Sequence, residues 1–489
     1  MKQKNIIVIG SGFAGLSAAT HLAHQGHQVT ILEKNNQVGG RARVFQDSGF
    51  TFDMGPSWYW MPDVFENYFK YFGKDVKDYY DLVRLDPSYR IFYEQNDIAD
   101  IPAKWNELKA FFEERESGSG EQLDAFMKEA AYKYEVGINK LVHKPGKSLL
   151  EFLDTDLMKG LFKLQVFTKF SKHARKFFSD PKLLQLVEFP ILFLGATPQD
   201  TPALYSLMNY ADMKLGTWYP MGGMHKIVQA MQQLAEEKGV NIITGEEVKG
   251  FNYSGKSITE VETTSNRYAC DLVVSGADYH HTETLLNGHR NYTEAYWNKR
   301  VMAPSSLLFY LGVDKKIANL KHHNLFFDED FNEHAKEIYK NPAWPKKPLF
   351  YVCTPSKTDP SVAPEGKENI FVLIPLAPGL QDDTEEQREK YFNMVMDRME
   401  QFTGEKIREH IVYKRSYAQT EFIQDYHAFK GNAYGLANTL SQTAILKPSL
   451  KNKNLNNLYY TGQLTVPGPG VPPSLISGKV VAEEILKAG

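Results

Sequence analysis

Apolar runs near the N-terminus predict a strand, a helix and a second strand in close succession. Residues 5–9 are β-branched and apolar after the first position, as expected of a parallel strand that is buried on both faces. Apolar positions recur at helical spacing over residues 16–23, and Gly26 ends the helix. A second apolar run, residues 28–32, ends at Glu33. This order predicts a βαβ unit of an α/β fold.

The turn between the first strand and the helix carries a glycine pattern that suits a diphosphate. Gly10 permits a tight turn, Gly12 lets a diphosphate approach the backbone, and Gly15 lets the helix pack closely on the strand. The free N–H groups and the dipole of the helix start would hold the phosphates. We therefore predict a Rossmann-like dinucleotide site that is built from Gly10, Ser11, Gly12, Ala14 and Gly15.

Glu33 and the residues after it indicate which dinucleotide binds. A carboxylate at the end of the second strand can accept both ribose hydroxyls of an adenosine, and it would repel a 2′-phosphate. Residues 38–43 place Gly40 and Arg41 where they can make further phosphate and ribose contacts. Such an extension is unusual for NAD, so it favours FAD. The alternative is that Arg41 and Arg43 are solvated side chains of a surface loop.

The C-terminal end of the chain repeats the pattern of strand, glycine turn and helix. Residues 457–462 form an apolar strand that runs into Gly462, and residues 472–482 form a helix that begins with proline. The positive end of that helix could stabilise the negative charge of a reduced flavin ring. The alternative is that this is simply the last helix of the fold.

Together these motifs resemble the carotenoid/retinoid oxidoreductase family, and within it the bacterial-type phytoene desaturases, a branch of the carotenoid desaturases. Residues 38–43 are similar to the G-G-R motif of the flavoprotein superfamily. Residues 53–58 are similar to the D-x-G-P segment of this branch, and residues 467–472 to its C-terminal P-G-x-G-V signature. Residues 463–466 depart from the small residues and histidine that are usual there. The resemblance therefore supports a flavin contact at Gly462 more than any role for those four side chains.

The resemblance implies a discontinuous FAD-binding domain with an inserted α+β substrate-binding domain. We assign residues 1–75, 222–285 and 440–489 to the FAD-binding domain, and residues 76–221 and 286–439 to the substrate domain. Within the middle FAD-binding segment a helix that ends at Lys238 is expected, followed by strands at 240–244, 248–253, 258–263 and 272–275.

The remaining cofactor contacts and the reaction also follow from the resemblance. Gly55, Pro56 and Val248 would touch FAD, with Val248 lying on the adenine. The substrate would be a long apolar polyene, phytoene or a related acyclic carotenoid, which is held beside the flavin in a dry tunnel. A hydride would pass to the flavin N5, and the allylic cation that remains would lose a proton.

No residue spacing identifies the proton acceptor, and the catalytic residues stay unknown. Asp53, His280 and His281 are conceivable, but each is expected to be structural because most polar side chains near a site serve hydrogen bonding. The sequence has no second strand-linked glycine motif for NADPH. Residues 118–120 lack the strand and the third glycine, so they are expected to form a loop. Reduced flavin would therefore be reoxidised by oxygen or a membrane quinone.

A basic and aromatic stretch, residues 157–182, predicts contact with a membrane surface. Residues 159–182 hold seven Lys or Arg and one acid. Apolar residues at three- and four-residue steps would lie among lipid tails while the basic side chains meet headgroups: Leu157, Leu161, Leu164, Phe167, Phe170, Ala174 and Phe177. The alternative is a core helix with a solvated basic face. The resemblance favours the membrane, because an insoluble hydrocarbon has to be collected from the bilayer.

Composition sets the outer limits. The 489 residues suggest two or three folding units, and a net charge of -3 from 56 basic and 59 acidic side chains gives no field that would gather nucleic acid. Cys270 and Cys353 have no spacing typical of a metal site or a disulfide framework, which fits a reducing compartment. No apolar run reaches the length of a membrane span. We expect a cytoplasmic protein that associates peripherally with the membrane.

Three alternatives stay open. The first is a 1-hydroxycarotenoid 3,4-desaturase of the same family. The second is an amine or protoporphyrinogen oxidase, but those enzymes often attach FAD through a cysteine, and no cysteine lies near the C-terminal motif. The third is a non-catalytic prenyl-lipid-binding protein of the Rab escort/GDI type. The presence of Glu33, Arg41 and Gly462 disfavours this last class, because a protein that does not bind the cofactor would not need these residues.

Overall fold

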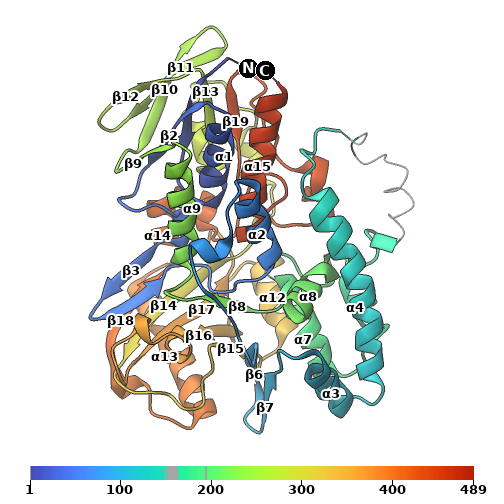
Figure 1. Cartoon of the computed structure of the whole chain (residues 1–489). Coiled ribbons are helices and arrows are strands. Elements are labelled where there is room, and N and C mark those ends of the chain that lie inside the picture. The colour runs from blue at the N-terminus through green and yellow to red at the C-terminus, as the bar shows by residue number, and fades with distance from the viewer. Residues whose placement is uncertain (1, 149–150, 152–162, 193–194, 489) are drawn as a thin grey trace.

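The computed structural model describes residues 2–148, 151, 163–192 and 195–488, and it shows two lobes (Figure 1). The upper lobe is built on a five-stranded parallel sheet in the order β19-β13-β1-β2-β9. Its strands are β1 (Asn5–Ile9), β2 (Gln28–Glu33), β9 (Asn241–Thr244), β13 (Leu272–Ser275) and β19 (Leu458–Tyr460). The sheet therefore joins strands from the start, the middle and the end of the chain.

Helices cover one face of this sheet, and an antiparallel three-stranded sheet covers the other. The helices are α1 (Phe13–His24), α9 (His225–Glu237) and α15 (Val471–Lys487), and the antiparallel strands are β10 (Val248–Ser254), β11 (Ser257–Thr263) and β12 (Arg267–Ala269). Ile6 and Val8 of β1 pack in the helical core, whereas Ile7 and Ile9 pack with the antiparallel strands. Since side chains alternate across a strand, β1 is buried on both faces, as its sequence predicts.

The two ends of the chain pack against each other through α1 and α15. A Cβ atom at Gly478 would lie 2.4 Å from the carbonyl oxygen of Ala14, so only glycine lets the helices approach this closely. The Ser17 hydroxyl donates to the Leu475 carbonyl at 2.7 Å across the same contact. The N- and C-termini lie side by side at the top of Figure 1. The contact brings the first turn of α15 beside the glycine turn that precedes α1.

The lower lobe is built on a seven-stranded sheet in the order β18-β14-β17-β16-β15-β6-β7. Its strands are β6 (Tyr89–Glu94), β7 (Asp97–Ile101), β14 (Ser305–Val313), β15 (His323–Phe326), β16 (Phe350–Cys353), β17 (Glu368–Leu376) and β18 (Ile411–Tyr417). Leu307 and Phe309 of β14 pack on one face against helix α13, whereas Leu308 and Tyr310 face the core shared with the upper lobe. The sheet therefore presents one apolar face to the interior between the lobes.

The other α-helices and strands of the described residues are eleven helices and two short antiparallel strand pairs, one of them a hairpin. The helices are α2 (Pro62–Tyr71), α3 (Trp105–Arg115), α4 (Ser119–Val136), α6 (Phe170–Ala174), α7 (Pro181–Leu192), α8 (Leu207–Tyr210), α10 (Tyr279–Thr284), α11 (Glu294–Asn298), α12 (Phe331–Tyr339), α13 (Glu385–Thr403) and α14 (Gln419–Tyr426). The hairpin pairs β3 (Val44–Asp47) with β4 (Phe50–Asp53), and a second antiparallel pair joins β5 (Leu82–Arg84) to the distant β8 (Trp218–Pro220). Helices α3, α4, α7 and α8 lie together along one side of the molecule (Figure 1).

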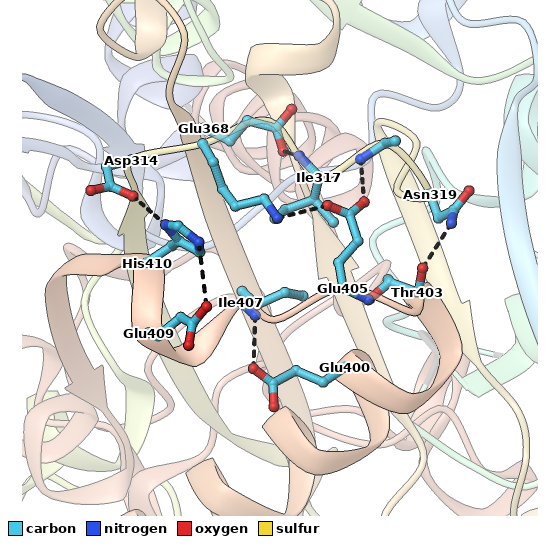
Figure 2. Close-up of polar contacts among 12 residues, drawn as sticks. Asp314, Ile317, Asn319, Glu368, Glu400, Thr403, Glu405, Ile407, Glu409 and His410 are labelled. Atoms are coloured by element: carbon cyan, nitrogen blue, oxygen red, sulfur yellow. Dashed lines mark hydrogen bonds and ion pairs between the residues drawn. The ribbon is translucent and has the colours of Figure 1, made fainter.

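Polar contacts link the start of β17 and the segment after β14 to the segment that follows α13 (Figure 2). Glu368 at the start of β17 accepts from the Ile317 amide at 3.1 Å and pairs with Lys357 at 2.6 Å. Beyond the end of α13, Glu405 pairs with Lys315 at 2.9 Å, and the chain turns back as Glu400 accepts from the Ile407 amide at 2.7 Å. These contacts hold α13 on the sheet face away from the interior.

The basic stretch does not form one amphipathic helix over its described part. Leu157 and Leu161 lie outside the described residues. Beyond them α6 spans only Phe170–Ala174, and Leu164, Phe170 and Ala174 are buried while Phe167 is 89% exposed. The Phe170 amide donates to the Thr201 carbonyl at 2.8 Å, which ties this stretch into the protein. The predicted lipid-facing stripe is therefore wrong for those three buried residues, which belong to the core.

Two smaller expectations can also be compared with the structure. Residues 118–120 do not form a loop throughout, because α4 begins at Ser119 after Gly118 with φ +82°. The segment still follows a helix and not a strand, so it has no dinucleotide-binding geometry. Within the described ranges, no helix combines the length and the apolar character that a bilayer span requires.

Candidate functional site

The glycine turn between β1 and α1 has the geometry that its sequence predicts. Gly10 has φ +88°, a conformation that favours glycine. A Cβ atom at Gly15 would lie 2.0 Å from the Gly10 carbonyl oxygen, so this position tolerates no side chain. Gly12 caps α1 and has nothing within 4 Å of where its Cβ would be. The turn thus leaves open space in front of the N-terminus of α1, where the peptide dipoles favour an anion.

Glu33 is held in place at the end of β2. The side chain is 4% exposed, and its Oε2 accepts from the Ser11 amide at 2.9 Å and from the Ser11 hydroxyl at 2.6 Å. Its Oε1 accepts from the Asn35 amide at 2.8 Å. The Asn35 side-chain amide also donates to Oε1, at 3.0 Å, so the carboxylate accepts four hydrogen bonds, which is about its full capacity. A ligand hydroxyl would therefore take the place of a side-chain donor, the Ser11 hydroxyl or the Asn35 amide group. The carboxylate is therefore oriented by the protein before any ligand arrives.

Arg41 lies beside this turn with part of its guanidinium unpaired. Its Nη2 donates to the Asn432 carbonyl at 3.3 Å, but its buried Nε has no hydrogen-bond partner among the described residues. A Cβ atom at Gly55 would lie 2.4 Å from the Arg41 carbonyl oxygen, so the backbone at Gly55 packs directly against that of Arg41. Gly40 has φ +54° and approaches Gly12. An unpaired, buried guanidinium N–H is costly unless an acceptor such as a phosphate or ribose oxygen reaches it.

The closing glycine turn lies against the opening one. Gly462 follows β19 with φ +109°, and a Cβ atom there would be 3.7 Å from the Ala14 Cβ. The Gly462 amide donates to the Ser477 hydroxyl of α15 at 2.9 Å. Both chain ends therefore contribute to one site, and the N-terminal turn of α15 points into it.

A single large cavity runs from these turns into the space between the lobes. All of the residues predicted to bind the cofactor line it except Gly15, which supports the turn from behind: Gly10, Ser11, Gly12, Ala14, Glu33, Gly40, Arg41, Gly55, Pro56, Val248 and Gly462. Apolar and aromatic side chains from the second lobe and nearby segments line the rest, among them Trp58, Trp60, Met208, Leu308, Tyr351, Phe371 and Leu373. One end of the cavity is thus polar and glycine-rich, and the other is apolar.

Several polar residues of the cavity wall have no signature in the local sequence. Asp278 follows β13, the neighbour of β1, and the rule that ligands bind at the carboxyl ends of parallel strands could have found it. Burial raises the pKa of Asp278, and burial lowers the pKa of Arg41, which the nearby Asp278 carboxyl opposes. Asp425 and Tyr426 reach the cavity from α14, and only the tertiary fold places them there.

The three conceivable proton acceptors have structural contacts. Asp53 accepts from the amides of Met224 and His225 at 2.7 and 2.9 Å at the start of α9. His280 hydrogen-bonds Glu294 at 2.9 Å, away from the cavity wall. His281 does line the cavity, where it stacks on His427 with ring centroids 3.8 Å apart, and burial lowers its pKa to about 4. None of these contacts distinguishes a catalytic base.

Lys447 is a buried cation beside the loop that leads into α15. The side chain is 6% exposed, its Nζ has no hydrogen-bond partner among the described residues, and burial lowers its pKa from 10.5 to about 7. Between about pH 7 and pH 10.5, Lys447 is protonated in the unfolded chain and neutral in the folded protein. The free energy of unfolding therefore rises with pH across that window. The full penalty of charging Lys447 remains below about pH 7.

Replacing Lys447 with methionine is expected to raise Tm at neutral pH and to flatten the rise of stability with pH. Removing the buried amine stabilises the fold by roughly 2–5 kcal/mol at neutral pH. Thermal unfolding at about pH 7 and about pH 10 would measure both effects. Lys299→Met removes an exposed lysine and is the matched control. A Tm gain that is equal for the two variants would contradict the assignment.

The geometry of the site fits FAD. The carboxylate of Glu33 can accept ribose hydroxyls, the N-terminus of α1 can hold a diphosphate, and the free Nε of Arg41 can donate to an oxygen of either group. The N-terminus of α15 at the closing turn supplies positive potential for the ring system. These donors and acceptors lie on one continuous surface.

Comparison with known proteins agrees with this geometry. The sequence profile of the family described as flavin containing amine oxidoreductase matches residues 13–486. A carotenoid 3,4-desaturase of Haloarcula japonica is 42% identical over 99% of this chain and 98% of its own length. A zeta-carotene-forming phytoene desaturase of Myxococcus xanthus is 30% identical over 99% of this chain and 94% of its own length.

Among solved structures, an oxidoreductase of Methanosarcina mazei superposes with a TM-score of 0.63 over 98% of this chain and 100% of its own length. The two sequences are 17% identical, so this likeness concerns the fold. The fold matches the Rossmann-like architecture with an inserted substrate domain that the sequence predicts. On the evidence of the family profile and of relatives that share the whole length of the chain, the protein belongs to the flavin containing amine oxidoreductase family, and within it to the carotenoid desaturases.

Proposed function

We propose that this protein is an FAD-dependent carotenoid desaturase that oxidises phytoene or a related acyclic carotenoid. The observation that carries the proposal is the single cavity with two different ends. Its glycine-rich end suits the dinucleotide, and its apolar end, lined from the seven-stranded sheet, suits a hydrocarbon chain. The relatives from Haloarcula japonica and Myxococcus xanthus are named as carotenoid desaturases, which supports the same substrate class.

In this proposal the chain binds and orients, and the cofactor supplies the redox chemistry. The chemistry that bound FAD would supply is the acceptance of a hydride from a carbon of the substrate. Glu33 would receive the ribose hydroxyls, the turn at Gly10 and Gly12 the diphosphate, and Gly462 the ring system. Leu308 and Leu373, paired across β14 and β17, would hold the polyene and exclude water. Positioning of this kind can supply a large part of a rate enhancement without a polar catalytic group.

A 3,4-desaturation is the second candidate, and one observation favours it. The Haloarcula japonica protein, named for that reaction, shares 42% of its residues with this chain, whereas the phytoene desaturase of Myxococcus xanthus shares 30%. Liposomes loaded with phytoene or with a hydroxylated carotenoid, incubated with the protein under air, would separate the two by the absorbance of the products. New bands from phytoene support the first candidate, and new bands from the hydroxylated carotenoid alone support the second. The absence of product from both phytoene and the hydroxylated carotenoid would contradict the desaturase proposal.

The electron acceptor in this proposal is oxygen or a membrane quinone. The sequence offers one strand-linked glycine motif, which the FAD site uses, and no second one for NADPH. Turnover should therefore continue under air, or without air when a soluble quinone is added. Dependence on NADPH in both conditions would contradict this part of the proposal.

We further propose that the protein docks peripherally on membranes through the exposed part of the basic stretch. Phe167 is 89% exposed, and the exposed cations Lys163, Lys169, Lys172, Arg175 and Lys176 lie near it in the sequence. An aromatic side chain flanked by cations suits the interface of an anionic bilayer.

Replacing Phe167 with aspartate is expected to reduce co-sedimentation with anionic liposomes several-fold. The change removes an apolar anchor and adds a charge that the headgroups repel. Val412→Asp, at a side chain that is 49% exposed, is the control for a new surface carboxylate at an apolar position. If both variants sediment with liposomes as well as the parent protein, Phe167 does not contact the membrane.

A further inference from the structure

Three buried side chains that could bind a metal ion converge behind the wall of the cofactor cavity. They are His322, His323 and Cys353, and one ring nitrogen of each histidine and the cysteine sulfur lie within 4.8 Å of one another. His323 of β15 and Cys353 of β16 are direct partners across the antiparallel ladder, which puts both side chains on the same face. The His322 carbonyl accepts from the Thr354 amide at 2.7 Å, which fixes the third residue beside the other two.

The histidines are held as metal-binding histidines usually are. The Nδ1 of His322 hydrogen-bonds the Thr358 hydroxyl at 2.7 Å, and the Nδ1 of His323 hydrogen-bonds the Tyr351 hydroxyl at 2.6 Å. A hydroxyl oxygen can accept from an Nδ1–H, and that tautomer leaves a lone pair on Nε2. The Nε2 atoms of both rings are buried and have no hydrogen-bond partner among the described residues. Two buried ring nitrogens without partners are costly unless another group satisfies them.

The surroundings can accommodate a cation. Cys353 lines a small cavity of about 20 Å³ that neither histidine lines and that has room for one water. Asp53 borders the same cavity. The buried Asp359 accepts from the Tyr219 hydroxyl at 3.3 Å, and the Tyr219 ring packs on the His322 ring. Neither carboxylate forms an ion pair with Lys, Arg or His within the described ranges. The two carboxylates could therefore balance the charge of a metal cation bound beside them.

We propose that His322, His323 and Cys353 bind one zinc ion, with a water molecule as the fourth ligand. Two imidazoles and a thiolate are the donor types that zinc prefers. A tetrahedral zinc site needs ligand atoms about 3.3–3.6 Å apart, so the three groups would draw together by about 1 Å through side-chain rotation. This site is separate from the cofactor and does not depend on the proposed reaction.

The bound ion would hold the apolar wall of the cofactor cavity in a fixed position. Trp58 and Tyr351 both line that cavity. Trp58 stacks on His323 with ring centroids 4.1 Å apart, and Tyr351 hydrogen-bonds both His323 and the Cys353 side chain. An ion that fixes His323 and Cys353 therefore fixes two residues of the wall. Its role is structural, and it transfers no electron.

The test is the metal content of the FAD-containing protein, purified with zinc in the growth medium and without a metal-affinity step. The expected result is about one zinc per chain in the parent protein and in Cys270→Ser, the matched control at the other cysteine, with less than about a tenth of that in Cys353→Ser. Retained flavin absorbance shows that each variant is folded. Cobalt(II) added to the zinc-depleted parent protein should give the absorbance of a thiolate-to-cobalt transition that Cys353→Ser lacks.

Two results would overturn the proposal. One is a parent protein that carries no zinc and gains no more from added zinc than Cys353→Ser does. The other is equal zinc in the parent protein and in Cys353→Ser, since the metal would then be bound elsewhere.

Discussion

Replacing Glu33 with arginine is expected to give a protein that purifies without FAD. The carboxylate is 4% exposed and is already oriented by Ser11 and Asn35, so it meets the ribose at no further cost in ordering. A guanidinium cannot accept a hydroxyl hydrogen and cannot replace the acceptor of the Ser11 amide. We expect the ratio of flavin to protein to fall by about tenfold or more.

The control for this prediction is Glu386→Arg, which makes the same change at an exposed position in the first turn of α13. That variant should retain FAD at the level of the parent protein. Far-ultraviolet circular dichroism would show whether Glu33→Arg keeps its secondary structure. Equal flavin content in Glu33→Arg and the parent protein would refute the role of Glu33.

Replacing Leu373 with glutamate is expected to abolish desaturation while FAD stays bound. Leu373 lines the cavity from β17, directly opposite Leu308 on β14, and far in sequence from the glycine turns. A carboxylate there would be desolvated by a hydrocarbon substrate and would also admit water. We expect the rate of product formation to fall by about a hundredfold or more, with flavin content within about a factor of two of the parent protein.

Leu373→Met is the matched control, because it keeps the volume and apolar character of the side chain. It should desaturate at nearly the parent rate. The pair of variants separates the two ends of the cavity, since in the proposed arrangement Glu33 binds the cofactor and Leu373 contacts the substrate. If Leu373→Glu kept full activity, the polyene would not pass along this sheet.

The parts of the fold that the sequence predicts are those with a local cause. Gly10 and Gly15 are required by a positive φ and by a 2.0 Å approach, and a strand buried on both faces has to be apolar along most of its length. The strand at 5–9 accordingly has the predicted bounds, and the strand at 272–275 does too. The residues predicted to bind the cofactor lie together around one cavity for the same reason, because turns and strand ends place most of them.

The parts of the fold that the sequence does not predict depend on contacts between residues that are distant in the chain. In the seven-stranded sheet, β15 pairs in parallel with β6, so that Asn324 lies opposite Arg90, and no local pattern records that pairing. The apolar end of the cavity comes from this sheet and was not predicted residue by residue. Spacing in the basic stretch is equally typical of a core helix and a lipid-facing helix, and burial of Phe170 decides for the core where the structure describes it.

The most direct test of the whole account is an anaerobic titration of the FAD-containing protein with its carotenoid substrate. If one cavity holds the flavin and the polyene together, the flavin absorbance should bleach as the polyene absorbance shifts to longer wavelength, with one new double bond for each flavin reduced. A polyene that gains double bonds while the flavin stays oxidised without any acceptor, or a flavin that stays oxidised beside unchanged carotenoid, would contradict it.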